Sequence, residues 1–125
     1  MFSEATKLNS NYSEAFYNLG SVQKKIGRFQ EAIASYKRAI QITPNYIDAH
    51  NNLGNIYKDL GLFNEAIESY EWAISYGPNY TIAHMNLASI YSSYDLEKAL
   101  QHYQKAISIE PNFPEAHYSL GTVYS

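Results

Sequence analysis

Apolar and small side chains recur along this chain with the spacing of amphipathic helices. Counted from Ser13, Ile47 and Thr81, they fall at positions 3, 4, 7, 8, 10, 11 and 14 of each segment. At about 100° per residue these positions project onto one broad arc, as a helix with a buried face requires. A second set falls at positions 17, 20, 21, 24, 27 and 28. The pattern predicts paired helices over residues 13–26 and 30–42, 47–60 and 64–76, 81–93 and 96–109, and a further helix from 114 onward.

The paired helices form one unit that repeats along the chain. Matching segments begin at Glu14, Asp48, Ile82 and Glu115, at spacings of 34, 34 and 33 residues. A fixed period of this length is typical of stacked helical repeats. We therefore divide the chain into the end of a preceding second helix (1–12), three repeats (13–46, 47–80 and 81–113) and the first helix of a truncated fourth repeat (114–125). Phe2, Ala5 and Leu8 match the second-helix pattern, so we expect a piece of a longer array.

Glycine and proline mark the predicted turns. Gly27 and Gly61 stand where the first helix of a pair ends, and glycine accepts the left-handed backbone of a helix C-terminus. Pro44, Pro78 and Pro111 cannot continue the second helix, and an asparagine directly after each is expected to cap the next one. The third repeat has no turn glycine and is one residue shorter, so we expect a tighter turn there with Asp95 as the helix cap.

Small side chains within the repeat predict close helix packing. In the first repeat these are Ala15, Gly20 and Ala32, and we expect Leu19, Tyr36 and Ile40 to fill the volume that remains between the paired helices. These residues need no functional explanation.

The alternation of Leu-Gly, Tyr, Ala, Tyr, Ala and Pro over 34 residues resembles the tetratricopeptide repeat (TPR) family, from Phe2 to Tyr124. The resemblance implies an all-α fold, a right-handed α-solenoid of antiparallel helix pairs. Its concave wall would come mainly from the first helix of each pair. It also implies a protein-protein interaction scaffold that binds an extended or helical segment of a client protein in that groove.

The polar arc of the first helices supplies the candidate peptide-binding residues. Asparagine holds position 6 in three successive repeats, and an amide suits pairing with the C=O and N–H of an extended peptide. The alternative is that these asparagines brace neighbouring turns or are ordinary solvated surface. The full candidate set is Asn18, Asn52, Asn86, Tyr17, Asn51, Asn55, Met85, Ser89 and Tyr118.

Within the TPR family, the run from Ala49 to Gly54, Ala-His-Asn-Asn-Leu-Gly, resembles the TPR superhelix of O-linked N-acetylglucosamine (O-GlcNAc) transferases. That resemblance implies an asparagine ladder that grips substrate backbones. It gives an alternative function: the substrate-docking region of a glycosyltransferase whose catalytic domain is not in this chain. Chaperone-binding clamps are a poorer match. At the places where those clamps contact their ligand, Asn52 agrees with the clamp pattern, whereas Tyr17, Ser21, Ile82 and Asn86 differ from it.

Composition narrows the partners further. The formal net charge is -3, with no basic stripe that could neutralise phosphates, so we expect no nucleic-acid binding. No apolar run reaches the length of a membrane span and the start lacks the layout of a signal peptide, so we expect a soluble protein of the cytoplasm or nucleus. The absence of cysteine removes disulfides and thiolate sites.

No catalytic, cofactor or metal site is expected. His50, His84 and His117 recur in equivalent places, but adjacent repeats would hold them about 10 Å apart, too far for one metal ion. Each can satisfy a ring nitrogen locally, whereas His102 has no identifiable partner. Glycines form no phosphate loop and no serine stands in a nucleophile elbow, so this chain is not expected to be an enzyme by itself.

Trp72 stands where the flanking repeats carry Arg38 and Lys105, which predicts a position on the convex surface. Two interpretations stay open: partial burial along its helix, or a contact site that includes a dimer contact. The apolar faces at both ends of the array are a second place where a dimer is predicted.

Overall fold

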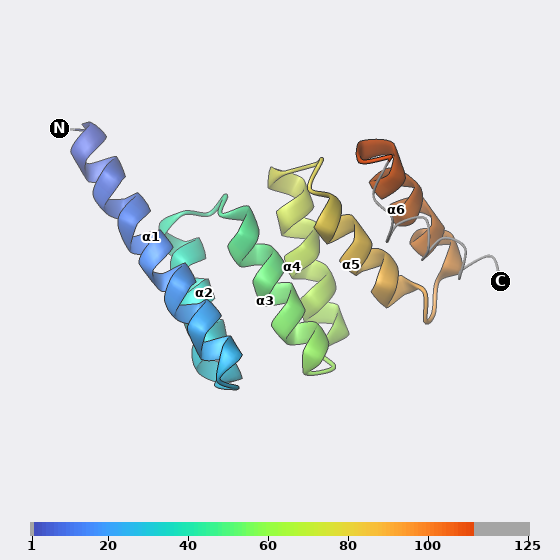
Figure 1. Ribbon diagram of the computed structural model, residues 1–125, viewed down its shortest axis with the longest axis horizontal. Helices are drawn as coiled ribbons and strands as arrows, with labels where there is room; N and C mark the ends of the chain where they lie inside the picture. Colours follow the sequence, from blue (N-terminus) through green and yellow to red (C-terminus); the bar gives the residue numbers. More distant parts are fainter. Residues whose placement is uncertain (1, 112–125) are drawn as a thin grey trace. The chain divides into compact units, whose positions relative to one another are not determined.

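The computed structural model describes the backbone of residues 2–111 and the side chains of residues 11–111. Six α-helices and no strand lie in this range (Figure 1). They are α1 (Phe2–Lys25), α2 (Phe29–Ile42), α3 (Ile47–Asp59), α4 (Phe63–Tyr76), α5 (Thr81–Tyr91) and α6 (Leu96–Ile109). The all-α class of helical repeats is thus confirmed. The helix predicted from residue 114 onward lies outside the described residues.

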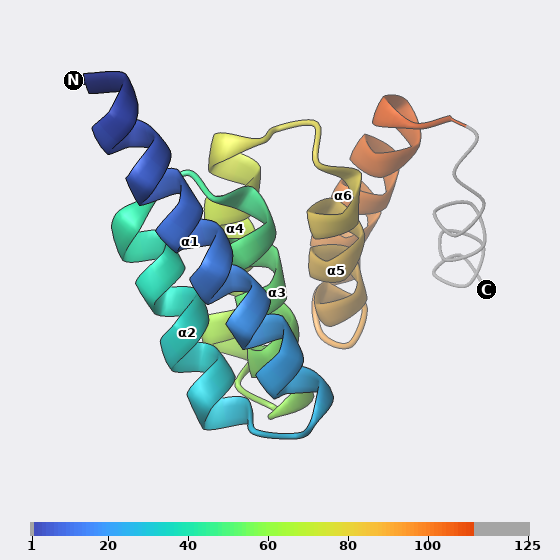
Figure 2. The same ribbon diagram turned by 60° about the vertical axis from the view of Figure 1, so that its left-hand side comes forward.

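Two compact units make up the chain, Met1–Ser69 and Tyr70–Ser125, and their boundary falls within α4. The first unit contains α1, α2 and α3, with α1 antiparallel to α2 and α3 beside them (Figures 1 and 2). The second contains the antiparallel pair α5 and α6. From α2 to α6 each helix begins and ends within two residues of its predicted limits.

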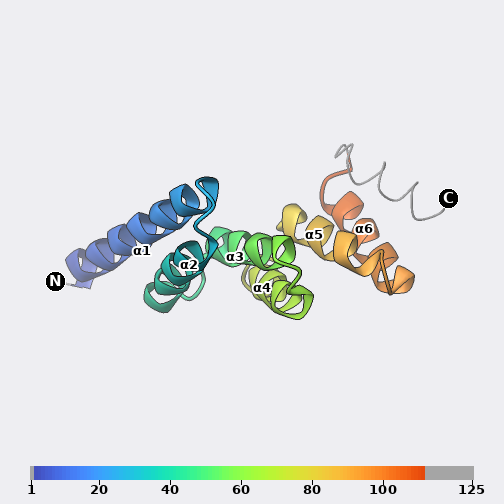
Figure 3. The same cartoon turned by 90° about the horizontal axis from the view of Figure 1, so that it is seen from below.

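α1 departs from the prediction at its start. It runs without a break from Phe2 and projects beyond the end of α2 (Figure 3), so the predicted start of a separate first helix at Ser13 is wrong. Ser10 occupies the place that Pro44 and Pro78 hold in the following repeats. Because serine keeps its backbone N–H and has no ring to clash with the preceding turn, the helix continues through this point.

Left-handed glycines end the first helix of the first two pairs, as predicted. Gly27 has φ +83° and Gly61 has φ +77°. After α1, Gly27 N–H donates to Lys24 O at 3.0 Å and Arg28 N–H donates to Gln23 O at 2.8 Å. These two bonds form a Schellman motif, which satisfies carbonyls that the helix end would otherwise leave unpaired.

The remaining turns use different caps. Asp95 caps α6 as predicted, because its side chain accepts from Lys98 N–H at 3.2 Å. The expected asparagine caps are wrong for α3 and α5, whose N-cap residues are Tyr46 and Tyr80 and make no side-chain cap bond. The first turn of α3 is held instead by backbone bonds to Tyr46 O.

The core of the first unit is built on Tyr36, which is fully buried with Ala32, Ala39, Ala49 and Ile56. Gly20 makes this possible, because a Cβ there would lie 2.9 Å from the Tyr36 ring. The predicted close approach at Gly20 and Ala32 is therefore confirmed.

Ala15 and Leu19 do not share this interface, so the prediction for them is wrong. Ala15 is exposed and Leu19 is 46% exposed, whereas the equivalent Leu53 and Leu87 are 6% and 1% exposed. Val22 and Ile26 continue the same exposed face of α1. Within the first unit, α2 contacts α3, which is the first helix of the next repeat. In a stack of repeats, a preceding second helix covers the equivalent face of a first helix such as α1.

Candidate peptide-binding site

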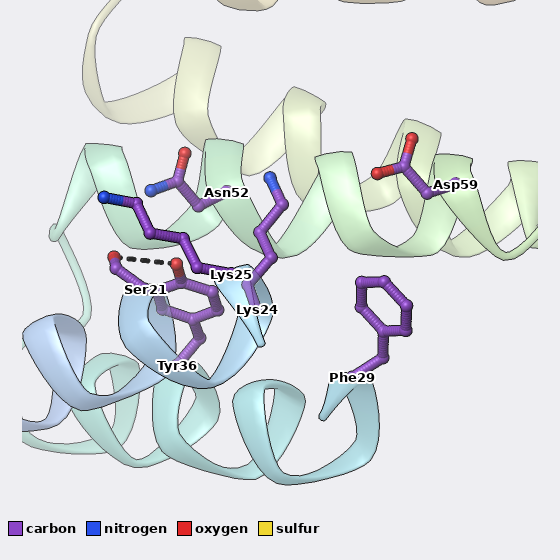
Figure 4. Close-up of a pocket in the computed structure, with 7 residues that line it drawn as sticks. All are labelled: Ser21, Lys24, Lys25, Phe29, Tyr36, Asn52 and Asp59. Carbon is purple, nitrogen blue, oxygen red and sulfur yellow. Dashed lines mark hydrogen bonds between the residues drawn. The ribbon is translucent and has the colours of Figure 1, made fainter. Parts of the chain in front are cut away.

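A cavity of about 430 Å³ opens in the first unit beside α1, α2 and α3 (Figure 4). Each of the three helices or their turns contributes to its wall, so its shape depends on the packing around Tyr36. The lining residues are Ser21, Lys24, Lys25, Phe29, Tyr36, Asn52 and Asp59.

The wall beside Tyr36 is a fixed hydrogen-bond chain. Ser21 Oγ donates to the carbonyl of Tyr17 at 3.1 Å, so its single proton is used. The Tyr36 hydroxyl lies 2.9 Å from Ser21 Oγ, so these two hydroxyl groups also share a hydrogen bond (Figure 4).

Tyr17 and Asn52 join α1 to α3 at the edge of the cavity. The Asn52 Nδ2 atom donates to the Tyr17 hydroxyl at 2.9 Å. Tyr17 also stacks on Tyr46, with ring centroids 5.0 Å apart, and packs at a tilt against Tyr36 at 5.7 Å. The amide is thereby oriented, and it keeps one N–H beyond the bond to Tyr17.

Both tyrosines at this edge stay neutral near pH 7. Burial raises the pKa of Tyr17, the Asp48 charge adds to the effect, and the bonds from Asn52 and Ser21 oppose it. Burial likewise raises the pKa of Tyr46, together with the nearby Tyr17, Glu14 and Asp48. Their hydroxyl groups therefore act as neutral hydrogen-bonding groups.

Both positive and negative side chains line the cavity. Lys24 is half-buried and Lys25 exposed, both in the last turn of α1, and Asp59 ends α3. Among the residues with described side chains, neither lysine has an ion-pair partner, and the ion pair found there joins Arg28 to Glu31 at 3.6 Å. Figure 4 shows Lys25 on the Asn52 side of the cavity, with Phe29 and Asp59 on the opposite side.

The candidate residues identified from the sequence are distributed unevenly. In the first unit Asn18 is exposed, Asn55 is half-buried and Asn51 is only 3% exposed. On α5, Ser89 is exposed, whereas Met85 and Asn86 are half-buried. Tyr118 lies outside the described residues. Of the set, Asn52 lines the cavity and donates to the Tyr17 hydroxyl, and the assignment of all nine remains a prediction.

Sequence reasoning missed part of the cavity wall. Lys24 and Lys25 belong to the polar arc of the first helix and were identifiable as groove residues from their positions 12 and 13. Phe29 follows the turn glycine and gave no signal, because its part in the wall depends on how the turn folds. Asp59 stands at position 13 of the second repeat, the same place in the polar arc as Lys25, and was identifiable in the same way.

The histidines are structural in the described repeats. His50 Nε2 lies 2.8 Å from Pro44 O, and His84 Nε2 lies 3.0 Å from Pro78 O, so each imidazole ties its helix to the turn before it. Burial lowers the pKa of both rings. Within residues 11–111 no three histidine or carboxylate side chains gather as metal ligands. His117 is outside the described residues.

His102 has a partner, contrary to the prediction. Its Nδ1 atom lies 3.1 Å from Nδ1 of His84, and its ring stacks on Tyr91 with centroids 5.7 Å apart. The partner is separated by 18 residues in sequence, so only the packing of α6 on α5 reveals it.

Trp72 is 47% exposed and stacks on Tyr76 with centroids 5.9 Å apart. The stack accounts for the partial burial that was one of the two interpretations. No helix in the described part of the chain is long and apolar enough to cross a membrane.

Comparison with known families accounts for this architecture. A family model described as TPR repeat matches residues 24–61 and 91–125, and two models described as tetratricopeptide repeat match residues 47–80 and 1–34. The chain therefore belongs to the TPR family, a class of helical-repeat proteins that mediate protein interactions. A search of curated proteins gave no match.

Solved structures of TPR domains share the fold. The first TPR of Spaghetti (RPAP3), bound to HSP90 peptide SRMEEVD, has a TM-score of 0.86 at 24% identity, with 92% of each chain covered. The Arabidopsis OM64 TPR domain has a TM-score of 0.86 at 18% identity, covering 93% of this chain and 97% of that one. MamA has a TM-score of 0.78 at 33% identity, and the match covers 85% of this chain and 63% of that one. No glycosyltransferase is named among these families and structures.

Proposed function

We propose that this chain is a protein-interaction module that holds an extended or helical segment of a client protein along the first helices of its repeats. The observation that carries the proposal is the cavity beside α1 and α3, where an oriented amide and two lysines without ion-pair partners surround an aromatic wall. Convergent polar groups on a concave, partly aromatic surface are typical of peptide sites.

The asparagines at position 6 are the proposed backbone contacts. Asn18 is exposed, and Asn52 is positioned by its bond to Tyr17 with donor and acceptor capacity left over. The bond to Tyr17 also supports the bracing alternative, since it joins α3 to α1. A test must therefore measure binding and stability together.

The test replaces Asn18, Asn52 and Asn86 with alanine and measures binding of peptides selected from a random 12-residue display library against the unmodified chain. We expect binding to weaken about tenfold or more, because each lost amide bond contributes about 1 kcal/mol. We expect the helical melt by circular dichroism to change little. The matched control replaces Gln30, Gln101 and Gln104, exposed amides on second helices, and should retain binding.

Two results would contradict the proposal. Selection of no binding peptide would argue against a peptide groove. A large loss of thermal stability with unchanged peptide affinity would show that the asparagines are braces.

The resemblance of Ala49–Gly54 to O-GlcNAc transferases supports a narrower proposal, that the groove docks substrates of a glycosyltransferase. It predicts a glycosyltransferase domain in the same gene, which sequencing of the parent transcript would reveal. A transcript that encodes only TPR repeats would exclude it.

The exposed face of α1 supports a self-association proposal. Leu19, Val22 and Ile26 lie along one side of α1, and half-exposed Trp72 offers a second contact. We expect concentration-dependent dimers by size-exclusion chromatography with light scattering. Replacing Leu19 and Val22 with serine should abolish them if the α1 face is the contact, and Trp72→Ala should do so if the tryptophan is.

A further inference from the structure

An exposed aromatic pair distinguishes α4 from the two other second helices, α2 and α6. Trp72 is 47% exposed and Tyr76 is 40% exposed, although their rings stack on each other with centroids 5.9 Å apart. In the other second helices these two places hold a basic residue and then an isoleucine, Arg38 and Ile42 in α2, and Lys105 and Ile109 in α6. The helix packing therefore does not require aromatic residues at these places, and exposed aromatic side chains are enriched at protein interfaces.

Two carboxylates extend the same side of α4. Glu65, Glu68, Trp72 and Tyr76 are spaced by 3, 4 and 4 residues along this one continuous helix, and all of them are exposed. Residues three or four apart are neighbours on a helix surface, so the helix itself places these side chains in one row, here called the α4 stripe. Neither carboxylate of the stripe has an ion-pair partner among the residues with described side chains.

The excess negative charge of the chain is concentrated on this helix. α4 contains Glu65, Glu68 and Glu71, with no lysine, arginine or histidine. The other nine acidic residues of the sequence equal its nine lysines and arginines in number, so the formal charge of -3 is that of α4 alone. By contrast, α2 and α6 each carry two lysine or arginine side chains. A negative field at α4 attracts a basic partner and repels nucleic acid.

We infer that the α4 stripe binds a basic segment of a partner protein, with an arginine that stacks on the Trp72 indole and pairs with the Glu68 carboxylate. Tryptophan is the strongest cation–π partner, and a planar guanidinium can lie on the ring while its N–H groups donate to a carboxylate. Glu68 stands one turn before Trp72, within reach of the same guanidinium. This surface is separate from the cavity beside α1 and α3, so the inference goes beyond the peptide groove. A second copy of the chain is the alternative occupant.

Counter-selection isolates ligands of this surface. Peptides from a random 12-residue display library are selected on the unmodified chain and then depleted on Trp72→Arg, which introduces the residue type that α2 carries at Arg38. Peptides that bind elsewhere bind both proteins and are removed. We expect the retained peptides to share an arginine. Circular dichroism checks that the variant keeps its helical content.

Tryptophan fluorescence reports on the site directly, because Trp72 is the one tryptophan in the sequence. Retained peptides that lack tryptophan should change its emission when they bind. We expect Glu68→Gln to weaken this binding about fivefold, because it removes one charged partner of the arginine. Glu97→Gln removes an exposed carboxylate from α6 and is the control, which should leave binding unchanged. Lysine in place of the peptide arginine should also weaken binding, because an ammonium lacks the planar fork.

Three outcomes overturn the inference. The first is that no peptide is retained, or that the retained peptides share no arginine. The second is an equal loss of affinity in Glu68→Gln and Glu97→Gln. The third is that light scattering shows dimers which Trp72→Arg converts to monomers while no peptide is retained, because the occupant is then a second copy of this chain.

The triple alanine variant of the asparagines at position 6 separates this surface from the groove. It should bind the retained peptides with unchanged affinity, and a loss would place those peptides in the groove and overturn the inference. Failure of the α4 stripe therefore leaves the proposed function standing, and failure of the groove leaves the α4 stripe standing.

Discussion

The first and third repeats bring the same two positions of their helix pair into contact but fill them with different chemistry. In the first repeat Gln23 on α1 faces Ser35 on α2, and Ser35 Oγ donates to Gln23 Oε1 at 2.6 Å. In the third repeat the equivalent Tyr91 on α5 stacks on His102 of α6, with ring centroids 5.7 Å apart. A small polar pair in one repeat is an aromatic pair in the other.

Some positions of the helix pair keep the same residue type in both repeats, and others vary. Tyr36 and Tyr103 are equivalent and both buried, and the alanines around them are fully buried in both units. The Gln23–Ser35 and Tyr91–His102 pairs lie beside this constant core and exchange together. At these two positions the packing requires side chains that match each other in size and hydrogen bonding. Polar or aromatic residues can therefore replace one another as a pair while the helices keep their packing.

The largest expected effect tests the constant part. Tyr36→Ala should cost about 3–5 kcal/mol of unfolding free energy, because it leaves a cavity in the core of the first unit and removes the partner of Ser21. Tyr103→Ala should cost a similar amount in the second unit. Chemical denaturation gives the two losses, and hydrogen exchange resolved along the chain locates them. A loss below 1 kcal/mol at either tyrosine would show that the two cores are not equivalent.

Much of this constant core was predictable from the sequence, because its signals are local. The period places Tyr36 and Tyr103 on buried faces, and Gly27 and Gly61 carry the positive φ that their places required. The uninterrupted α1 also had a local signal, the serine at position 10 where the next repeats have proline. The predicted helix start at Ser13 followed from the 34-residue spacing and did not take the missing proline into account.

The candidate site and the variable pairs were less predictable, because they depend on which side chains meet across helices. Asn52 was identified from its position, but its bond to Tyr17 is separated by 35 residues in sequence. The meeting of His84 and His102 needs the packing of α6 on α5. Exposure of Leu19, against burial of Leu53 and Leu87, depends on which neighbours are present and not on the residue itself.

A smaller effect distinguishes the repeats by pH. Burial lowers the pKa of His84, with a further contribution from Lys105, and burial together with His84 and Lys98 lowers the pKa of His102. Since these pKa values are lower in the folded state, the unfolded chain binds more protons below its histidine pKa of about 6.5, and stability falls as the pH falls through that value. The slope is at most about 1.4 kcal/mol per pH unit for each proton.

The second unit should therefore lose more stability than the first between pH 7.5 and 5.5, since the first contains the single described histidine His50. Hydrogen exchange in α6 and α2 at the two pH values measures the difference. His102→Gln should reduce the loss in α6 and leave α2 unchanged. Equal acceleration of exchange in both helices would mean that the histidine pair does not determine the pH response.

The smallest effect concerns the polar pair of the first repeat. Ser35→Ala removes the bond to Gln23, and we expect a loss of about 0.5–1.5 kcal/mol, the usual contribution of one such bond. A double-mutant cycle with Gln23→Ala isolates the coupling between the two side chains, because each single variant removes the same bond. Ser69→Ala is the control for loss of a serine hydroxyl without loss of a bond to glutamine. Ser69 occupies the equivalent place in the second repeat, where Tyr57 stands in place of Gln23. A coupling near zero would show that Gln23 and Ser35 merely fill space, and the contrast with Tyr91 and His102 would then be one of volume alone.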